Sequence, residues 1–71
     1  MLGAELRKAR EAAGLTQEKL GFAAKLSREY VNQLEQERKS PTVKVLLRIC
    51  RAMEIKAWKL LRAIEDDHSR K

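Results

Sequence analysis

A polar segment near the middle of the chain carries side chains that form directional hydrogen bonds. Arg28, Asn32 and Gln33 recur at helical spacing, and Ser27 and Glu29 lie beside them. Arginine can donate two hydrogen bonds to guanine O6 and N7, and asparagine or glutamine can pair with adenine N6 and N7. Such groups on one side of a helix can fit a major groove. The alternative is an ordinary solvated helix face, and the segment by itself does not decide between the two.

Reactive side chains in catalytic arrangements are missing from the sequence. Cys50 is the only cysteine, and His68 is the only histidine and sits among charged residues. No Ser/His/Asp or Cys/His set, phosphate-binding glycine loop or cluster of metal ligands can be assembled. We therefore expect a protein that is not an enzyme and that uses no cofactor and no metal.

The charge balance favours a polyanionic partner. Sixteen Lys and Arg outnumber ten Asp and Glu, which gives a net charge of +6. A small domain with that field attracts nucleic acid, although excess basic residues can also merely solubilise a helical surface. No apolar run approaches the roughly 20 residues that a membrane span needs, so we expect no membrane partner. One cysteine and no signal-peptide pattern favour the cytoplasm.

The spacing of apolar residues predicts an all-α domain of five short helices over residues 1–71, with an ordered core at about 2–65 and a polar tail at 66–71. Gly14 suits the end of the first helix, and Thr16, Ser27 and Thr42 suit the starts of the second, third and fourth. The apolar residues that mark these helices are Leu2, Leu6, Ala9 and Ala13; Leu20 and Ala24, on the inner side of the second; Tyr30, Val31 and Leu34; Val43, Leu46, Leu47, Cys50 and Met53, on the apolar side of the fourth; and Ala57, Leu60, Leu61 and Ile64, on one face of the fifth.

The second and third helices form a predicted helix-turn-helix between about Thr16 and Glu35. Two helices joined by a three- or four-residue turn pack near a right angle and need a small residue where they meet. Gly21 satisfies that need. The third helix then projects its polar side outward, which favours base reading over a merely solvated face.

Several separated positions together resemble the phage-repressor/Cro-like (Xre) helix-turn-helix family over about residues 3–64. The matching residues are Leu15-Thr16-Gln17, Leu20, Leu26-Ser27-Arg28, Tyr30-Val31, Leu34-Glu35 and Ser40-Pro41-Thr42. Phe22, Ala24, Leu26, Arg28 and Tyr30 are most similar to small restriction–modification controller proteins. The resemblance implies a compact lambda-repressor-like fold and a transcriptional regulator, a repressor or controller, that binds double-stranded DNA sequence-specifically. The alternative is an antitoxin or another protein-interaction module on the same fold.

The resemblance also implies roles for individual residues. Base contacts fall to Arg28, Asn32 and Gln33, with Ser27 and Glu29 as secondary candidates, although Glu29 could equally orient Arg28. Phosphate contacts fall to Gln17, Tyr30, Arg38 and Lys39, which would position the protein without reading sequence. Arg10 and Glu35 match an ion pair that holds the recognition helix, so we expect a structural role for both.

The sequence departs from the family where glycine is usual, at Lys25, Glu37 and Glu54. These backbones are either strained or built as different turns. Lys25 lies in the turn itself, where it either adds a phosphate contact or is simply tolerated as an exposed residue.

Two aromatic residues have no clear place in the predicted core. Phe22 lies off the apolar stripe of its helix, so it either covers the first helix or stays partly exposed. Trp58 suits the core and a subunit interface equally. Because family members often dimerise through their C-terminal region, we hypothesise a homodimer through Trp58 and Leu61, with DNA half-sites about 34 Å apart. Cys50 is expected to be a small core residue.

Overall fold

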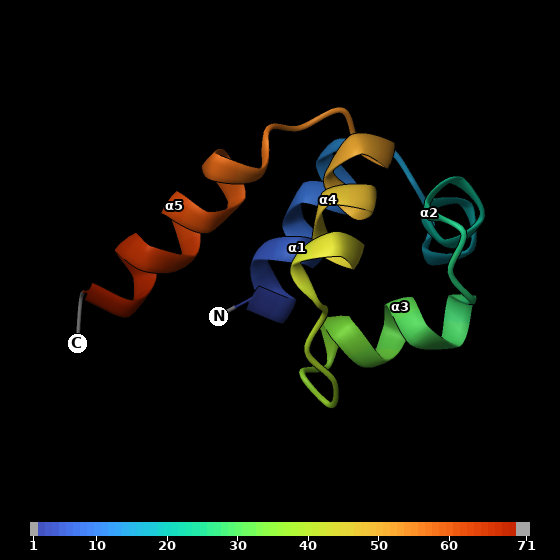
Figure 1. The fold of residues 1–71 in the computed structure, drawn as a ribbon, viewed down its shortest axis with the longest axis horizontal. Coiled ribbons are helices and arrows are strands. Elements are labelled where there is room, and N and C mark those ends of the chain that lie inside the picture. The colour runs from blue at the N-terminus through green and yellow to red at the C-terminus, as the bar shows by residue number, and fades with distance from the viewer. Residues whose placement is uncertain (1, 70–71) are drawn as a thin grey trace.

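Five α-helices account for most of the chain, as predicted. The computed structural model describes residues 2–69, in the order α1 (Leu2–Ala12), α2 (Gln17–Ala24), α3 (Arg28–Glu35), α4 (Val43–Ala52) and α5 (Ala57–Ser69). Figure 1 shows α1 and α4 at the centre, α2 and α3 together at one end of the molecule, and α5 at the other. No helix within residues 2–69 is long and apolar enough to cross a membrane.

Short polar side chains begin three of the helices at the positions that the sequence predicts. The hydroxyl oxygens of Thr16, Ser27 and Thr42 each accept a hydrogen bond from the backbone N–H three residues later, at 3.0, 3.0 and 3.1 Å. Each bond satisfies one of the N–H groups that a helix leaves unpaired at its start. Local chemistry therefore sets where α2, α3 and α4 begin.

The core lies where α1, α2, α3 and α4 meet. Its fully buried side chains are Leu6, Leu20, Val31, Leu34 and Ile49. A smaller cluster of Leu46, Cys50 and Leu60 joins α5 to α4 and α1. Burying five large aliphatic side chains contributes about 1.5–3 kcal/mol each before the entropy of ordering the chain is counted.

The predicted apolar face of α4 is wrong at two positions. Val43 is 75% exposed and Leu47 is 49% exposed, whereas Ile49, which the prediction left out, is buried. The helix carries apolar residues on three sides, and packing against α2 selects the side centred on Ile49 and Met53. Leu61, which the prediction placed with Leu60 on one face of the fifth helix, is exposed as well.

The polar tail predicted at residues 66–71 is in part helical. Helix α5 continues to Ser69, and residues 70 and 71 lie outside the described residues. No glycine or proline interrupts this segment, and Arg62 Nε lies 3.9 Å from Asp66 Oδ2, one helical turn further on. Side-chain pairs at this spacing favour continuation of a helix.

The three residues that replace the usual glycines all adopt left-handed backbone. Lys25, Glu37 and Glu54 have φ values of 60°, 59° and 55°, and Gly14 has 74°. At each of the four sites, the N–H of the left-handed residue donates to a carbonyl three residues back, and the next N–H donates five residues back. These paired bonds define the Schellman motif. The turns are therefore built in the usual way, with strain at three of them.

Relieving this strain is expected to stabilise the fold. Glu54→Gly should raise the free energy of unfolding by about 0.5–1 kcal/mol, because the left-handed cost of the Cβ exceeds the entropy that glycine adds to the unfolded chain. Urea denaturation measures the change. Gly14→Ala is the reciprocal control: a Cβ there meets open space, so the backbone alone should lower stability by a similar amount. Loss of stability in Glu54→Gly would contradict the strain argument.

Candidate nucleic-acid interface

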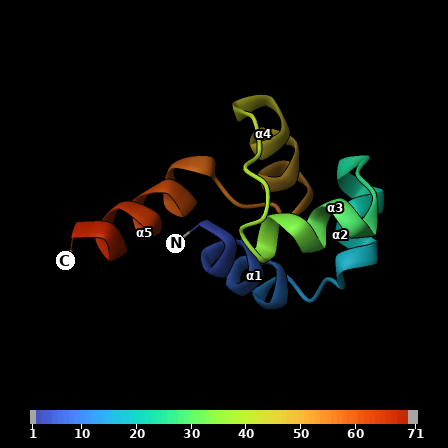
Figure 2. The same ribbon diagram turned by 90° about the horizontal axis from the view of Figure 1, so that it is seen from below.

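Helices α2 and α3 cross at Gly21, as the sequence predicts. A Cβ at Gly21 would lie only 2.6 Å from the carbonyl oxygen of Leu26, so a larger residue would force the helices apart. Residues 25–27 form the connection, and Figures 1 and 2 both show α3 lying beside α2. The close approach fixes how α3 projects from the rest of the domain.

One side of α3 faces the core and the other faces outward. Val31 and Leu34 are buried. The predicted base-reading residues lie on the opposite side: Ser27, Arg28 and Glu29 are exposed, and Asn32 and Gln33 are half-buried. The structure thus brings all five onto one outward surface.

A buried ion pair holds the end of α3 against α1. Arg10 Nε and Nη2 donate to Glu35 Oε2 and Oε1 at 2.5 and 3.1 Å, and Arg10 Nη1 donates to the Leu15 carbonyl at 2.8 Å. The two side chains are only 11% and 4% exposed. The hydrogen bond to Glu35, opposed by desolvation and aided by the charge of Glu35, raises the pKa of Arg10 above its usual value. The predicted scaffold role of this pair is confirmed.

Close backbone packing reinforces the ion pair. A Cβ at Gly3 would lie 2.5 Å from the Glu35 carbonyl oxygen and 2.9 Å from that of Leu34. The absence of a side chain at Gly3 lets the start of α1 approach the end of α3. Nothing in the spacing of the sequence indicated this role.

Gln17 connects α2 to the same network. Its Nε2 donates to Glu35 Oε1 and to Asn32 Oδ1, both at 3.1 Å. Both amide hydrogens of Gln17 are therefore directed into the protein, whereas the family resemblance implied a side chain free to hold phosphate. The bond to Asn32 was not predicted.

A hollow of about 370 Å³ opens beside the start of α2. Arg10, Thr16, Gln17, Glu18 and Arg28 line it, and we call it the α2 hollow. Arg28 and the positive end of the α2 dipole favour an anion such as phosphate here, whereas the charge of Arg10 is already paired with Glu35 and Glu18 adds a negative charge.

Arg48 holds the turn from the other side. From α4, its Nε and Nη2 donate to the Ala24 carbonyl at 3.1 and 2.7 Å, and Nη2 also donates to the Lys25 carbonyl at 2.8 Å. These are carbonyls that the end of α2 leaves without helical partners. No residue spacing indicated this role of Arg48, because it depends on how α4 packs against α2.

Basic residues flank α3 at both ends. Lys25 lies before it, and Arg38 and Lys39 follow it in an exposed loop. Tyr30 differs from them because it is half-buried and packs against the core. The predicted phosphate-contacting residues other than Gln17 and Tyr30 are therefore exposed around the outward face of α3.

Other candidate residues lie away from this face. Phe22 on α2 is 88% exposed, so it does not cover α1. Trp58 and Leu61 on α5 are 57% and 50% exposed, which rules out a core role for Trp58.

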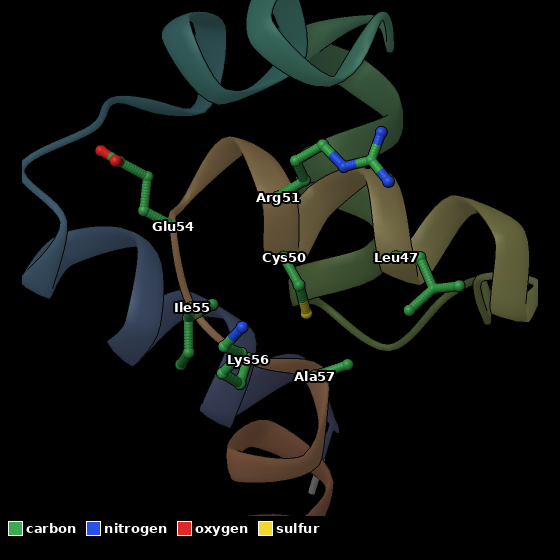
Figure 3. A pocket seen from close by; sticks show the side chains of 7 residues that line it. All are labelled: Leu47, Cys50, Arg51, Glu54, Ile55, Lys56 and Ala57. Atoms are coloured by element: carbon green, nitrogen blue, oxygen red, sulfur yellow. The ribbon is translucent and has the colours of Figure 1, made fainter.

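Cys50 is buried, as expected. Figure 3 shows it among the residues around a hollow of about 500 Å³ between α4 and the segment leading into α5, lined by Leu47, Cys50, Arg51, Glu54, Ile55, Lys56 and Ala57. We call this the Cys50 hollow. Burial raises the pKa of the Cys50 thiol, which keeps it protonated and unreactive. Among the described residues, no group of His, Cys, Asp and Glu could hold a metal ion.

Breaking the buried ion pair is expected to destabilise the domain strongly. Arg10→Met should lower the free energy of unfolding by about 3 kcal/mol, because it leaves Glu35 buried without a cation. Arg10→Met/Glu35→Leu should recover much of that loss. Arg7→Met provides a control, since Arg7 pairs with Glu11 on the exposed side of α1 and should change stability by less than about 1 kcal/mol. Equal effects of the two single substitutions in urea denaturation would contradict this ranking.

Comparison with known proteins supports the identification of α2 and α3 as a helix-turn-helix. A family model described as helix-turn-helix matches residues 6–63. The HTH-type transcriptional regulator PrpR of Mycobacterium tuberculosis is 46% identical over 55 residues, which are 78% of this chain and 11% of PrpR. The chain thus spans only about a tenth of the length of that curated relative.

Solved structures extend the likeness to the whole fold. The restriction-modification controller protein C.AhdI from Aeromonas hydrophila is 34% identical with a TM-score of 0.80, over 83% of this chain and 89% of C.AhdI. The clp gene regulator ClgR from Corynebacterium glutamicum is 33% identical with a TM-score of 0.85, over 99% and 88%. The DNA-binding domain of the P22 c2 repressor, at 24% identity and a TM-score of 0.82 over 86% and 80%, shares the fold. The chain therefore belongs to the helix-turn-helix family, in its Xre-type form, and is a DNA-binding domain of the kind found in transcriptional regulators.

Proposed function

We propose that this domain binds double-stranded DNA sequence-specifically by placing the outward face of α3 in the major groove. The observation that carries the proposal is the grouping of Arg28, Asn32 and Gln33 on one side of a helix whose other side is buried. A buried ion pair and Gly21 fix that helix, which lowers the entropy lost on binding. Binding alone performs this function, so we assign the chain no catalysis, cofactor or metal.

The five candidate base contacts comprise three primary residues and two secondary ones. Arg28 is exposed at the start of α3 and suits guanine, where it can donate two hydrogen bonds. Asn32 and Gln33 follow one turn later, and Ser27 and Glu29 are secondary contacts at the edge of the same face. Residues near the start of the recognition helix are the ones that reach base edges in this docking geometry.

Basic groups around α3 supply the contacts to the sugar-phosphate backbone of the DNA. Lys25, Arg38 and Lys39 would hold phosphates on both sides of the groove, with the Tyr30 hydroxyl as a further contact. Because both amide hydrogens of Gln17 are engaged, we assign its phosphate contact to its backbone N–H at the α2 hollow. The net charge of +6 adds attraction over a longer range.

Substitutions at Arg28 and Lys39 are expected to separate base recognition from electrostatic attraction to the DNA phosphates. Arg28→Ala should relax the preference at one base pair and cost about 1–3 kcal/mol on the best site, because a bidentate base contact is lost. Lys39→Ala should weaken binding to all sequences alike and reduce the slope of log K against log salt concentration by about 1, because one phosphate contact is lost. Selection from a random DNA library, followed by titrations at several salt concentrations, measures both. Equal binding of random DNA and the best selected site would overturn sequence-specific recognition.

We further propose that the protein acts as a cytoplasmic homodimer through α5. Trp58 and Leu61 are large apolar side chains left half-exposed, and Leu47 lies exposed at the rim of the Cys50 hollow. Exposed apolar surface of this kind favours a protein partner. A second copy would place two recognition helices about 34 Å apart on one face of the duplex. The single buried thiol is consistent with a reducing compartment.

Removing the proposed anchor is expected to dissociate the dimer. Trp58→Ala should shift sedimentation toward the monomer and weaken binding to a two-half-site DNA by at least about tenfold, since interface tryptophans often contribute 2 kcal/mol or more. Binding to a single half-site should change little. Phe22→Ala, which removes an even more exposed aromatic side chain on α2, should leave the oligomeric state unchanged. A wild-type protein that stays monomeric at high micromolar concentration would refute the dimer, and co-purification of another protein through Trp58 would favour the interaction-module alternative.

A further inference from the structure

The carboxamide of Asn32 is held in one orientation by its neighbours. Its oxygen Oδ1 accepts hydrogen bonds from Gln17 Nε2 at 3.1 Å and from Gln36 Nε2 at 3.4 Å. An amide oxygen has two lone pairs, so the ordinary bond from Gln17 occupies one acceptor position and the longer bond from Gln36 lies at the other. The amide nitrogen Nδ2 has no hydrogen-bond partner among the described residues, and the side chain is half-buried on the outward face of α3.

A buried charge determines this orientation. Arg10 has only donors, so the Glu35 carboxylate accepts from it. A carboxylate has only acceptors, so the Gln17 atom that faces Glu35 at 3.1 Å is its amide nitrogen. The same nitrogen faces Asn32, which must therefore present its oxygen inward. The direction of each hydrogen bond in this series is therefore fixed, from Arg10 on α1 to Asn32 on the proposed base-reading surface.

Gln33 provides a contrast on the same helix. Its amide makes no hydrogen bond to another described residue, so it can rotate and offer both a donor and an acceptor. The two neighbouring amides on α3 are therefore chemically different as they meet DNA, although their side chains carry the same functional group.

We propose that Asn32 reads DNA as a hydrogen-bond donor only and selects guanine rather than adenine. The two-bond pairing with adenine requires an asparagine oxygen that accepts from N6, and that oxygen is engaged with Gln17 and Gln36, so adenine offers only its N7 as an acceptor. Guanine presents two acceptors in the major groove, N7 and O6, and both match the amide hydrogens of Nδ2. Gln17 is therefore a positioning residue for specificity. This inference rests on the proposed DNA binding and names the base at one contact within it.

The experiment begins by locating the contact. Selection from a random DNA library with the wild type and with Asn32→Ala identifies the base pair whose preference Asn32 sets. We expect guanine there, favoured over adenine by about tenfold or more. Replacing that guanine with 7-deazaguanine removes one acceptor and should weaken wild-type binding by about tenfold, a measurement that needs no altered protein.

The decisive variant is Gln17→Met, which keeps the length of the side chain and removes its donor. Freed from Gln17 and held only by the longer bond from exposed Gln36, the Asn32 amide can turn, and the preference for guanine over adenine at that base pair should fall to near equality. The base pair read by Arg28 should keep its preference. A role for Gln17 in phosphate binding or folding alone would instead weaken all sequences uniformly. Gln33→Met is the matched control and should change a different base pair.

The outcomes separate this inference from the function on which it rests. If the wild type selects no consensus, DNA reading itself fails. If it selects a consensus with adenine at the Asn32 position, or if folded Gln17→Met leaves the preference unchanged, donor-only reading by Asn32 is wrong while sequence-specific binding stands. If Gln17→Met does not fold, the 7-deazaguanine and adenine substitutions with the wild type decide the question.

Discussion

The ion pair between Arg10 and Glu35 is the interaction on which the arrangement of the domain depends. Helix α3 has only eight residues, and a helix of that length is not stable alone in water. Its inner side is held by Val31 and Leu34, but apolar contacts do not set its rotation or its end point. The bidentate pair does so, because guanidinium and carboxylate planes must align.

The same ion pair stabilises the fold and also orients the Asn32 amide on the outward face of α3. Glu35 accepts from Arg10 and from Gln17, and Gln17 in turn donates to Asn32. The scaffold and the proposed reading surface are therefore one hydrogen-bonded system and not two independent layers. Arg48 has a comparable effect at the other end of α3, where it binds the carbonyls of the turn.

Local chemistry explains which parts of the structure were predictable from sequence. The caps at Thr16, Ser27 and Thr42 depend on residues three positions away, and Gly21 depends on a turn of known length, so sequence spacing revealed them. The Arg10–Glu35 pair, which spans 25 positions, was predicted only because the chain resembles a family. The exposed side of α3, which carries Arg28, Asn32 and Gln33, followed from the helical period, whereas their contacts with bases stay a prediction.

Tertiary contacts explain what was missed. The roles of Gly3, Arg48 and the Gln17 amide depend on which helices pack together, and no spacing rule contains that information. The face of α4 was misassigned for a related reason: apolar residues on three of its sides left the choice to packing against α2 and α5. The left-handed turns at Lys25, Glu37 and Glu54 were predicted in part: their positions were identified from the sequence, but whether the backbone there would be strained or differently built was not.

The placement of Cys50 makes the thiol a natural reporter of the C-terminal helix. The cysteine shares its small cluster with Leu60 and with Ala57, both contributed by α5. If α5 swings away from α4, the sulfur loses that cover, its pKa returns toward the ordinary value, and the thiolate becomes available to alkylating reagents. The rate of alkylation therefore reports every opening that uncovers Cys50, which includes detachment of the last helix and global unfolding, without any label being introduced.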